Sequence, residues 1–139
     1  MKYFAYGSNM NPDRMKARGV RFSHFQKAIL RGYTIGFNKL AAFGLPGEGK
    51  TNINRHPKGI VEGVLYDIED EDIVKLDKVE GNPSHYGKIQ VVVSTPDNQE
   101  LEVITYIAHP EKIRSGLKPS REYLSHLLAA KPYLTPDYY

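Results

Sequence analysis

Apolar and polar residues alternate along much of this chain in short runs that turn residues separate. Two such runs, 28–37 and 59–66, are interrupted by glycines, as strands that bend or bulge often are. Two more, 88–93 and 101–107, flank the turn sequence Thr-Pro-Asp-Asn and so predict an antiparallel hairpin. A shorter apolar and aromatic run at 3–6 indicates another strand. The pattern predicts a protein built mostly of β-strands.

Helical spacing replaces this alternation in three segments. After Asn11, a good N-cap, Pro12 begins a short predicted helix that Gly19 closes. A second helix is predicted over 69–80, and a third over 120–131, between a Pro-Ser start signal and a following proline.

The predicted helix over 69–80 ends on an unexpected charge. It has acids in its first turn, apolar residues at Ile73, Leu76 and Val79, and a closing Gly81. Glu80 therefore lies in the last turn, where the helix dipole opposes a negative charge by about 0.3–1 kcal/mol. The dipole and any burial would raise the pKa of this carboxyl group toward the range in which it can take and return a proton. A solvated glutamate at a helix end is the structural alternative.

A second unusual feature is the loop that follows the first strand. The run at 3–6 breaks directly into Gly7-Ser8-Asn9. Gly7 can adopt positive φ and lets a ligand approach the backbone, so that successive N–H groups can converge on a carboxylate or phosphate. A tight turn between a strand and a helix, with no ligand, explains the same residues.

Together these two features resemble a known family. The segments 4–10 (FAYGSNM) and 76–81 (LDKVEG), followed by Tyr86, are similar in order and spacing to motifs of the gamma-glutamylcyclotransferase superfamily, the AIG2-like family included. Weaker matches extend the resemblance over most of the chain, at 51–54, 61–66, Tyr106 and 119–123. The resemblance implies a single domain over residues 1–139 with an α+β fold. That fold is a small closed mixed β-barrel flanked by helices, with a cavity at one end formed by the loop and the glutamate.

The resemblance also implies a reaction that needs no cofactor. A gamma-glutamyl amide or peptide cyclises to 5-oxoproline and releases an amine or amino acid, and Glu80 serves as the single acid and base. The substrate-binding residues implied are Tyr6, Gly7, Ser8, Asn9, Tyr86, Tyr106 and Tyr123. Each tyrosine is equally explained as a core aromatic, because the chain has ten of them. The leaving amine depends on pocket shape, which a fold resemblance does not supply.

One motif points elsewhere. Residues 44–51 match the GxxxxGK[ST] pattern of a nucleotide-binding P-loop. A P-loop leads into a substantial helix, but Pro57 and Gly59 prevent a long helix here. The segment is therefore interpreted as a flexible glycine-rich loop, with a lid over the pocket as a further hypothesis. Two alternatives to the enzyme remain. The nearer one is a non-catalytic binding or interaction protein on the same fold, and the more remote one is a nucleotide-binding protein.

Composition limits the cofactors, metals and binding partners that this protein can have. The 139 residues include no cysteine, which excludes disulfides and cysteine nucleophiles, and the five histidines lack metal-binding spacing, so no metal is expected. No apolar run is long enough to span a membrane, and a cytoplasmic location is the default expectation. The net charge is +3, but no aromatic and basic RNA-binding signature accompanies it. We expect a small-molecule gamma-glutamyl substrate, neither nucleic acid nor membrane, and either a monomer or a homodimer.

Overall fold

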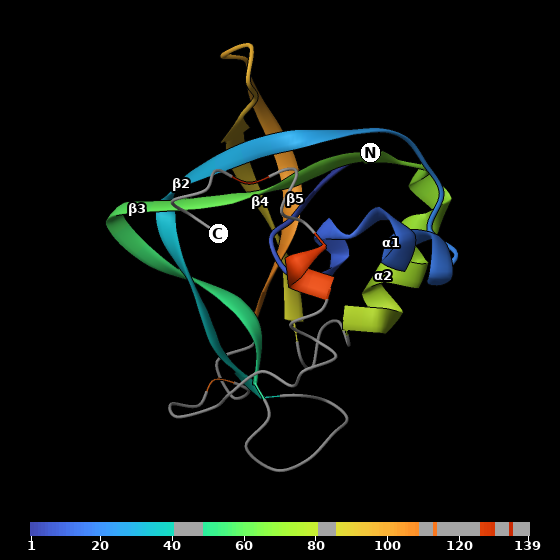
Figure 1. Cartoon of the computed structure of the whole chain (residues 1–139), viewed down its shortest axis with the longest axis horizontal. Helices are drawn as coiled ribbons and strands as arrows, with labels where there is room; N and C mark the ends of the chain where they lie inside the picture. The colour runs from blue at the N-terminus through green and yellow to red at the C-terminus, as the bar shows by residue number, and fades with distance from the viewer. Residues whose placement is uncertain (41–48, 81–85, 109–112, 114–125, 130–133, 135–139) are drawn as a thin grey trace.

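The computed structural model shows five strands that close into a barrel (Figure 1). It describes residues 1–40, 49–80, 86–108, 113, 126–129 and 134, except the side chains of 37–40, 49–51 and 80. The strands are β1 (Lys2–Ala5), β2 (Phe22–Leu40), β3 (Gly49–Ile68), β4 (Tyr86–Ser94) and β5 (Glu100–Ala108). They follow the order β1-β3-β2-β4-β5 around the barrel. All neighbours are antiparallel except β1 and β5, which are parallel, so the expected closed mixed barrel is confirmed.

The two longest strands, β2 and β3, extend beyond the runs that predicted them. They pair from Phe22 opposite Ile68 to Leu40 opposite Gly49, with a register shift between Arg31 and Tyr33. Both ribbons bend sharply together along their length (Figure 1). A Cβ at Gly59 would lie 2.2 Å from the carbonyl oxygen of Tyr33, so the strands approach there as only glycine permits. This bend lets one long pair form two sides of the barrel.

The predicted hairpin is confirmed in β4 and β5. Their register runs from Tyr86 opposite Ala108 to Ser94 opposite Glu100. In the turn, the N–H of Asn98 donates to the carbonyl of Thr95 at 2.9 Å, and Asn98 adopts φ 63°. Asparagine tolerates this left-handed conformation better than most residues, which explains its position in the turn.

Strand alternation separates the apolar side chains into two clusters. Phe4 and Tyr6 belong to one cluster with residues from β2, β3, β4 and β5, whereas Tyr3 and Ala5 belong to the other. The second cluster also contains Met10, Met15 and Leu76 from the helical segments, so it joins the barrel wall to the helices. Successive side chains of one short strand thus serve both cores, as the period of two requires.

The helical segments that follow β1 and β3 lie together on one side of the barrel (Figure 1). They are η1 (Ser8–Met10), α1 (Pro12–Ala17), η2 (Asp70–Asp72) and α2 (Ile73–Glu80). The side-chain oxygen of Asn11 caps α1 by accepting from the N–H of Asp13 at 3.1 Å, as the sequence predicts. Among the described residues, none of the helices is long and apolar enough to cross a membrane.

One helix prediction needs revision, and another is described only in part. The segment 69–80 is a 3₁₀ turn followed by α2 rather than one helix, and Val79 is 42% exposed instead of facing the core. Its apolar anchor is Leu76, which is fully buried. Most of the helix predicted over 120–131 lies outside the described residues, although 126–128 are helical.

Candidate active site

The loop after β1 is built from a 3₁₀ turn. The N–H of Met10 donates to the carbonyl of Gly7 at 3.0 Å, and that of Asn11 donates to the carbonyl of Ser8 at 3.2 Å. Gly7 has φ −115°, so it does not use the positive φ that the sequence suggested; Gly19, which follows α1, does so at φ 76°. The turn shape comes from these two hydrogen bonds rather than from a left-handed glycine.

Asn9 is the fixed point of this loop. Its side-chain Nδ2 donates to the hydroxyl of Tyr3 at 3.1 Å, and its Oδ1 accepts from Arg18 Nη1 at 2.6 Å. Its backbone carbonyl accepts from the hydroxyl of Tyr66 at 2.7 Å. Tyr3 of β1 and Arg18, the C-cap of α1, therefore hold the side chain of Asn9, and Tyr66 of β3 holds its backbone, so that the loop keeps its shape.

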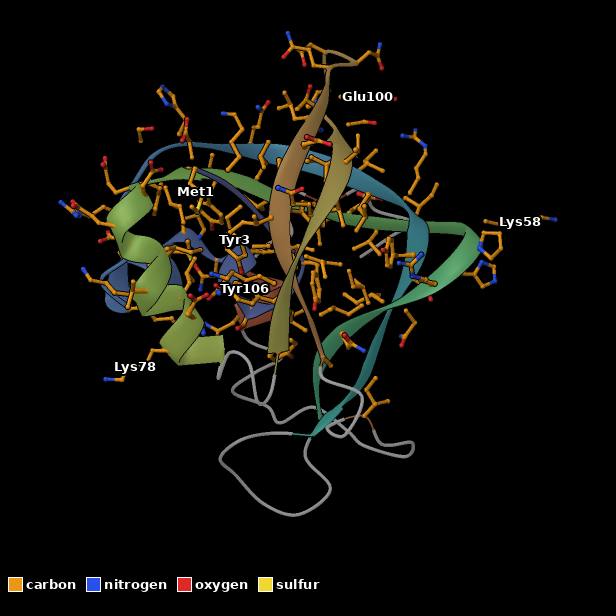
Figure 2. All side chains as sticks on the ribbon, turned by 180° about the vertical axis from the view of Figure 1, so that it is seen from behind. Met1, Tyr3, Lys58, Lys78, Glu100 and Tyr106 are labelled. Atoms are coloured by element: carbon orange, nitrogen blue, oxygen red, sulfur yellow. The ribbon has the colours of Figure 1, made fainter. Side chains whose placement is uncertain are left out.

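Tyr106 connects the loop to the end of α2. Its backbone carbonyl accepts from the hydroxyl of Tyr6 at 2.7 Å, and its own hydroxyl donates to Asp77 Oδ1 at 2.6 Å. Its ring also packs edge-on against Tyr3, with ring centroids 5.8 Å apart, and Figure 2 shows the two rings lying close together. A continuous set of contacts therefore runs from Asn9 through Tyr3 and Tyr106 to α2.

Of the remaining predicted site residues, some lie near these contacts and others lie wholly or partly outside the described structure. Tyr86 begins β4, is 7% exposed and belongs to the same apolar cluster as Tyr106. Glu80 is the last residue of α2, one turn beyond Asp77, while its side chain lies outside the described part of the structure. Tyr123 also lies outside the described residues. The structure thus brings together Tyr6, Asn9, Tyr86 and Tyr106.

The start of α2 is held by a buried carboxylate. Asp72 is 2% exposed, and its Oδ2 accepts from the backbone N–H of Arg21 at 2.8 Å and from its Nε at 3.0 Å. Lys75 Nζ lies 3.4 Å from Asp72 Oδ1. The hydrogen bonds from the Arg21 side chain and backbone, with a further one from Lys75, hold the pKa of Asp72 well below its usual range.

The family model described as "Gamma-glutamyl cyclotransferase, AIG2-like" matches residues 3–125, which include the loop, α2 and the hairpin. The chain belongs to this family. Among curated proteins it is similar to the gamma-glutamylcyclotransferase of Bos taurus, with 32% identity over 114 residues. The match covers 75% of this chain but only 57% of the bovine protein.

Solved structures agree with the family assignment at the level of the fold. A structure titled "Gamma-glutamyl cyclotransferase" superposes with a TM-score of 0.83 at 26% identity, covering 99% of this chain and 82% of the other. YkqA from Bacillus subtilis superposes with a TM-score of 0.85 at 26% identity, covering 99% of this chain and 50% of YkqA. The barrel with its flanking helices is thus a fold that gamma-glutamyl cyclotransferases share.

The nucleotide-binding interpretation of 44–51 fails on structure. Residues 44–48 lie outside the described part, but Gly49–Ile68 form β3. A strand therefore continues through Thr51, where a P-loop requires a helix N-terminus to face the phosphates. The flexible loop interpretation is also wrong for residues 49–51, because pairing with β2 draws them into the barrel.

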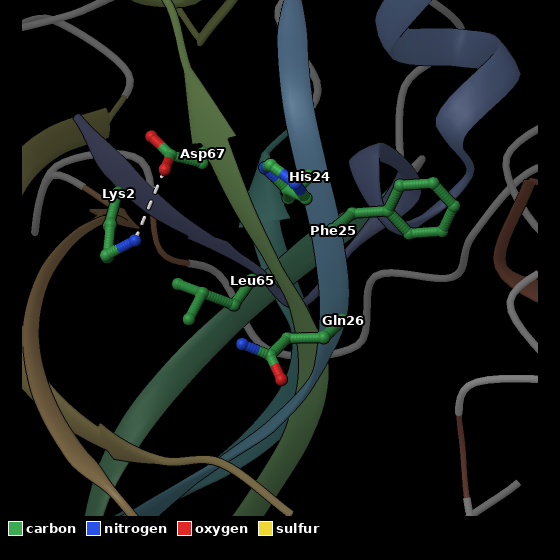
Figure 3. A pocket seen from close by; sticks show the side chains of 6 residues that line it. All are labelled: Lys2, His24, Phe25, Gln26, Leu65 and Asp67. Carbon is green, nitrogen blue, oxygen red and sulfur yellow. Dashed lines mark hydrogen bonds and ion pairs between the residues drawn. The ribbon is translucent and has the colours of Figure 1, made fainter.

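A surface pocket lies apart from the predicted site residues, and charged side chains form part of its lining. It has a volume of about 400 Å³ and is lined by Lys2, His24, Phe25, Gln26, Leu65 and Asp67. Within it, Lys2 Nζ and Asp67 Oδ2 form an ion pair at 3.3 Å (Figure 3). It contains none of the predicted site residues of this family. Within the described ranges, no three His, Asp or Glu side chains gather in a way that could hold a metal ion.

Sequence reasoning missed the residues that hold the site. Asp77 lies within the LDKVEG motif, three residues before Glu80, and this spacing was the available signal. The partners of Asn9 carried no such signal. Tyr66 is distant from Asn9 in sequence, and the residues around Arg18 show only an ordinary helix pattern. Only the closed barrel brings the Tyr66 hydroxyl to the loop.

We predict that Tyr66→Phe loosens the loop. The variant keeps the buried ring but leaves the carbonyl of Asn9 without this donor, so the free energy of unfolding should fall by about 1–3 kcal/mol. Urea unfolding measures the loss. Tyr33→Phe, which alters a half-exposed tyrosine, is the control and should change stability by less than about 0.5 kcal/mol. Equal stability of the two variants would show that the Tyr66 hydroxyl does not support the loop.

Because of the Asp72 carboxylate, the stability of the fold should depend on pH in the acidic range. Its pKa is lower in the folded than in the unfolded chain, so its contribution is full above the unfolded value, about 3.9. The contribution is lost as the pH falls below that value. Thermal unfolding of wild type and Asp72→Asn should therefore differ by a constant Tm gap from pH 7 to about pH 4, which narrows in stronger acid. A gap that stays constant down to pH 2 would contradict this linkage.

Proposed function

We propose that this chain is a gamma-glutamylcyclotransferase-type enzyme, formed by a single domain over residues 1–139. It cyclises a gamma-glutamyl amide or peptide to 5-oxoproline and releases the amine. Family membership supports this proposal. The observation that carries it is the double contact of Tyr106, whose carbonyl binds Tyr6 of the loop and whose hydroxyl binds Asp77 of α2. The two motifs of the family therefore adjoin the same residue.

Glu80 is the acid and base of the proposed reaction. It accepts a proton from the substrate α-ammonium, and the freed amine attacks the γ-carbonyl carbon to form the new C–N bond of the ring. The amide C–N bond then breaks as Glu80 returns this proton to the departing nitrogen. Glu80 passes on the second proton of the attacking nitrogen in the same way, so that the ring keeps one N–H and the amine leaves as an ammonium ion. The carboxylate is regenerated without net change, so one group suffices for both transfers.

Position 80 suits this role because of helix geometry. Residues three and four positions apart share a face of an α-helix, so position 80 lies on the same helix face as Leu76, which is buried, and Asp77, which binds Tyr106. Lys78 occupies a different face, and Figure 2 shows its side chain pointing away from the barrel. We therefore propose that Glu80 acts from the helix face that Asp77 and Tyr106 join to the barrel.

The loop and the tyrosines bind and orient the substrate. Backbone N–H groups over Tyr6–Asn9 hold the substrate α-carboxylate or the developing oxyanion. In a site without water, one fixed donor stabilises an oxyanion by roughly 3–4 kcal/mol. Tyr86 forms a wall of the pocket and donates a hydrogen bond, and Tyr123 lines it. Folding the substrate into a ring-forming geometry supplies much of the remaining rate enhancement.

Release of 5-oxoproline by the wild-type protein tests this function. The substrates are gamma-glutamyl amino acids, gamma-glutamyl amines, ε-(gamma-glutamyl)lysine and glutathione, each incubated with the purified chain. Release from one class supports the proposal and identifies the leaving group. Folded protein that binds one of these compounds without releasing 5-oxoproline would favour a non-catalytic binding protein on the same fold.

A further inference from the structure

We propose that Tyr106, Asp77 and Lys88 form a clamp that fixes the last turn of α2, and with it Glu80, against the barrel. The two oxygens of the Asp77 carboxylate are shared between partners on different strands. Oδ1 accepts from the hydroxyl of Tyr106 at 2.6 Å, and Oδ2 accepts from Lys88 Nζ at 2.9 Å. This inference rests on the proposed function for its catalytic consequence.

The two partners are held in place by the hairpin. Tyr106 of β5 and Lys88 of β4 are directly opposite in the antiparallel register, so their side chains leave the same face of the sheet side by side. Tyr106 is 2% exposed, and its carbonyl is bound by Tyr6. A carboxylate that bridges this pair fixes both the position of α2 and its rotation about the helix axis.

The short length of α2 explains the need for such a clamp. The helix has eight residues, and isolated helices of that length are marginal in water. Asp77 and Glu80 also place negative charge near its C-terminal end, which the dipole opposes. The ammonium group of Lys88 offsets the charge of Asp77. The arrangement thus supports a helix end in which two acidic residues outnumber the one basic residue, Lys78.

The clamp assigns Tyr106 a positioning role. Its hydroxyl donates to Asp77, so it acts on the reaction through α2. A displacement of about 1 Å at a catalytic group can lower the rate about a hundredfold. Asp77→Ala removes both contacts of the carboxylate and should therefore lower kcat by about ten- to a hundredfold with little change in KM. Tyr106→Phe and Lys88→Met remove one contact each and should cause smaller losses of the same kind.

Hydrogen exchange and kinetics together test the clamp. Amide exchange over residues 77–80 should be about tenfold faster in Asp77→Ala than in wild type. Lys2→Met is the control for Lys88→Met, since it removes another Lys–Asp ion pair, at 3.3 Å, that does not involve α2. It should change neither exchange at 77–80 nor kcat. In the Glu80→Gln background, Asp77→Ala should cause no further loss of turnover, because it acts through Glu80.

The outcomes separate the clamp from the proposed function. Unchanged exchange at 77–80 in Asp77→Ala would overturn the clamp whatever the activity. Faster exchange with wild-type kcat, or equal losses from Asp77→Ala with and without Glu80, would overturn its role in positioning the glutamate. If the wild-type protein releases no 5-oxoproline, the proposed function fails, while faster exchange still supports the clamp as a structural device.

Discussion

Glu80→Gln should abolish most turnover while leaving the fold intact. Glutamine has nearly the same size, but it cannot accept the proton of the substrate α-ammonium or return one to the leaving amine. Loss of a general acid–base group typically lowers the rate about 10²–10⁴-fold, and we expect kcat for 5-oxoproline release to fall within that range. The far-UV circular dichroism spectrum and the Tm should match those of the wild type.

Glu69→Gln is the matched control for this substitution. Glu69 is exposed, precedes η2 and lies on the segment that leads into α2. The same chemical change at that position should leave kcat within about twofold of wild type, as expected for a surface residue. A Glu80→Gln protein with kcat close to that of Glu69→Gln would remove Glu80 from the mechanism.

Leu76→Ala should be the most destabilising of the substitutions considered. The side chain is fully buried and packs with Met10, Met15 and Tyr106 in the cluster that joins the helices to the barrel. Truncating a buried leucine costs about 2–5 kcal/mol, because apolar contacts are lost and a cavity remains. Chemical denaturation should show a loss of that size in the free energy of unfolding.

Val74→Ala offers a control on the same helix. Val74 is 68% exposed, so its truncation removes little buried surface, and alanine has the higher helix propensity. Its stability should stay within about 0.5 kcal/mol of wild type. If Leu76→Ala lost no more than Val74→Ala, the packing of α2 on the barrel would contribute little to folding.

The strands were predictable from local patterns, but their ends were not. The hairpin of β4 and β5 follows from alternation around a turn sequence. The extension of β2 to Leu40 does not, because residues 38–40 lack apolar alternation and become a strand by pairing with 49–50. Pro57 similarly argues against a long β3, yet the strand continues across an irregularity in register. Tertiary pairing overrides local preference at both points.

The candidate site could likewise be predicted from the sequence only in part. The loop at 6–9 and the glutamate at the end of α2 were visible as breaks in local rules, which concentrate at functional positions. The connection between them was not visible, because it depends on Tyr106 lying 29 residues beyond Asp77 and opposite Lys88. The conformation of Gly7 was also not predictable, since two backbone hydrogen bonds of η1 determine it.

Product analysis with one gamma-glutamyl substrate and the purified wild-type chain tests the central claim most directly. We expect 5-oxoproline and free amine in equal amounts, with no glutamate, because the substrate's own α-amine is the nucleophile. Glutamate in place of 5-oxoproline would show that water attacks the γ-carbonyl, and would contradict the cyclisation mechanism.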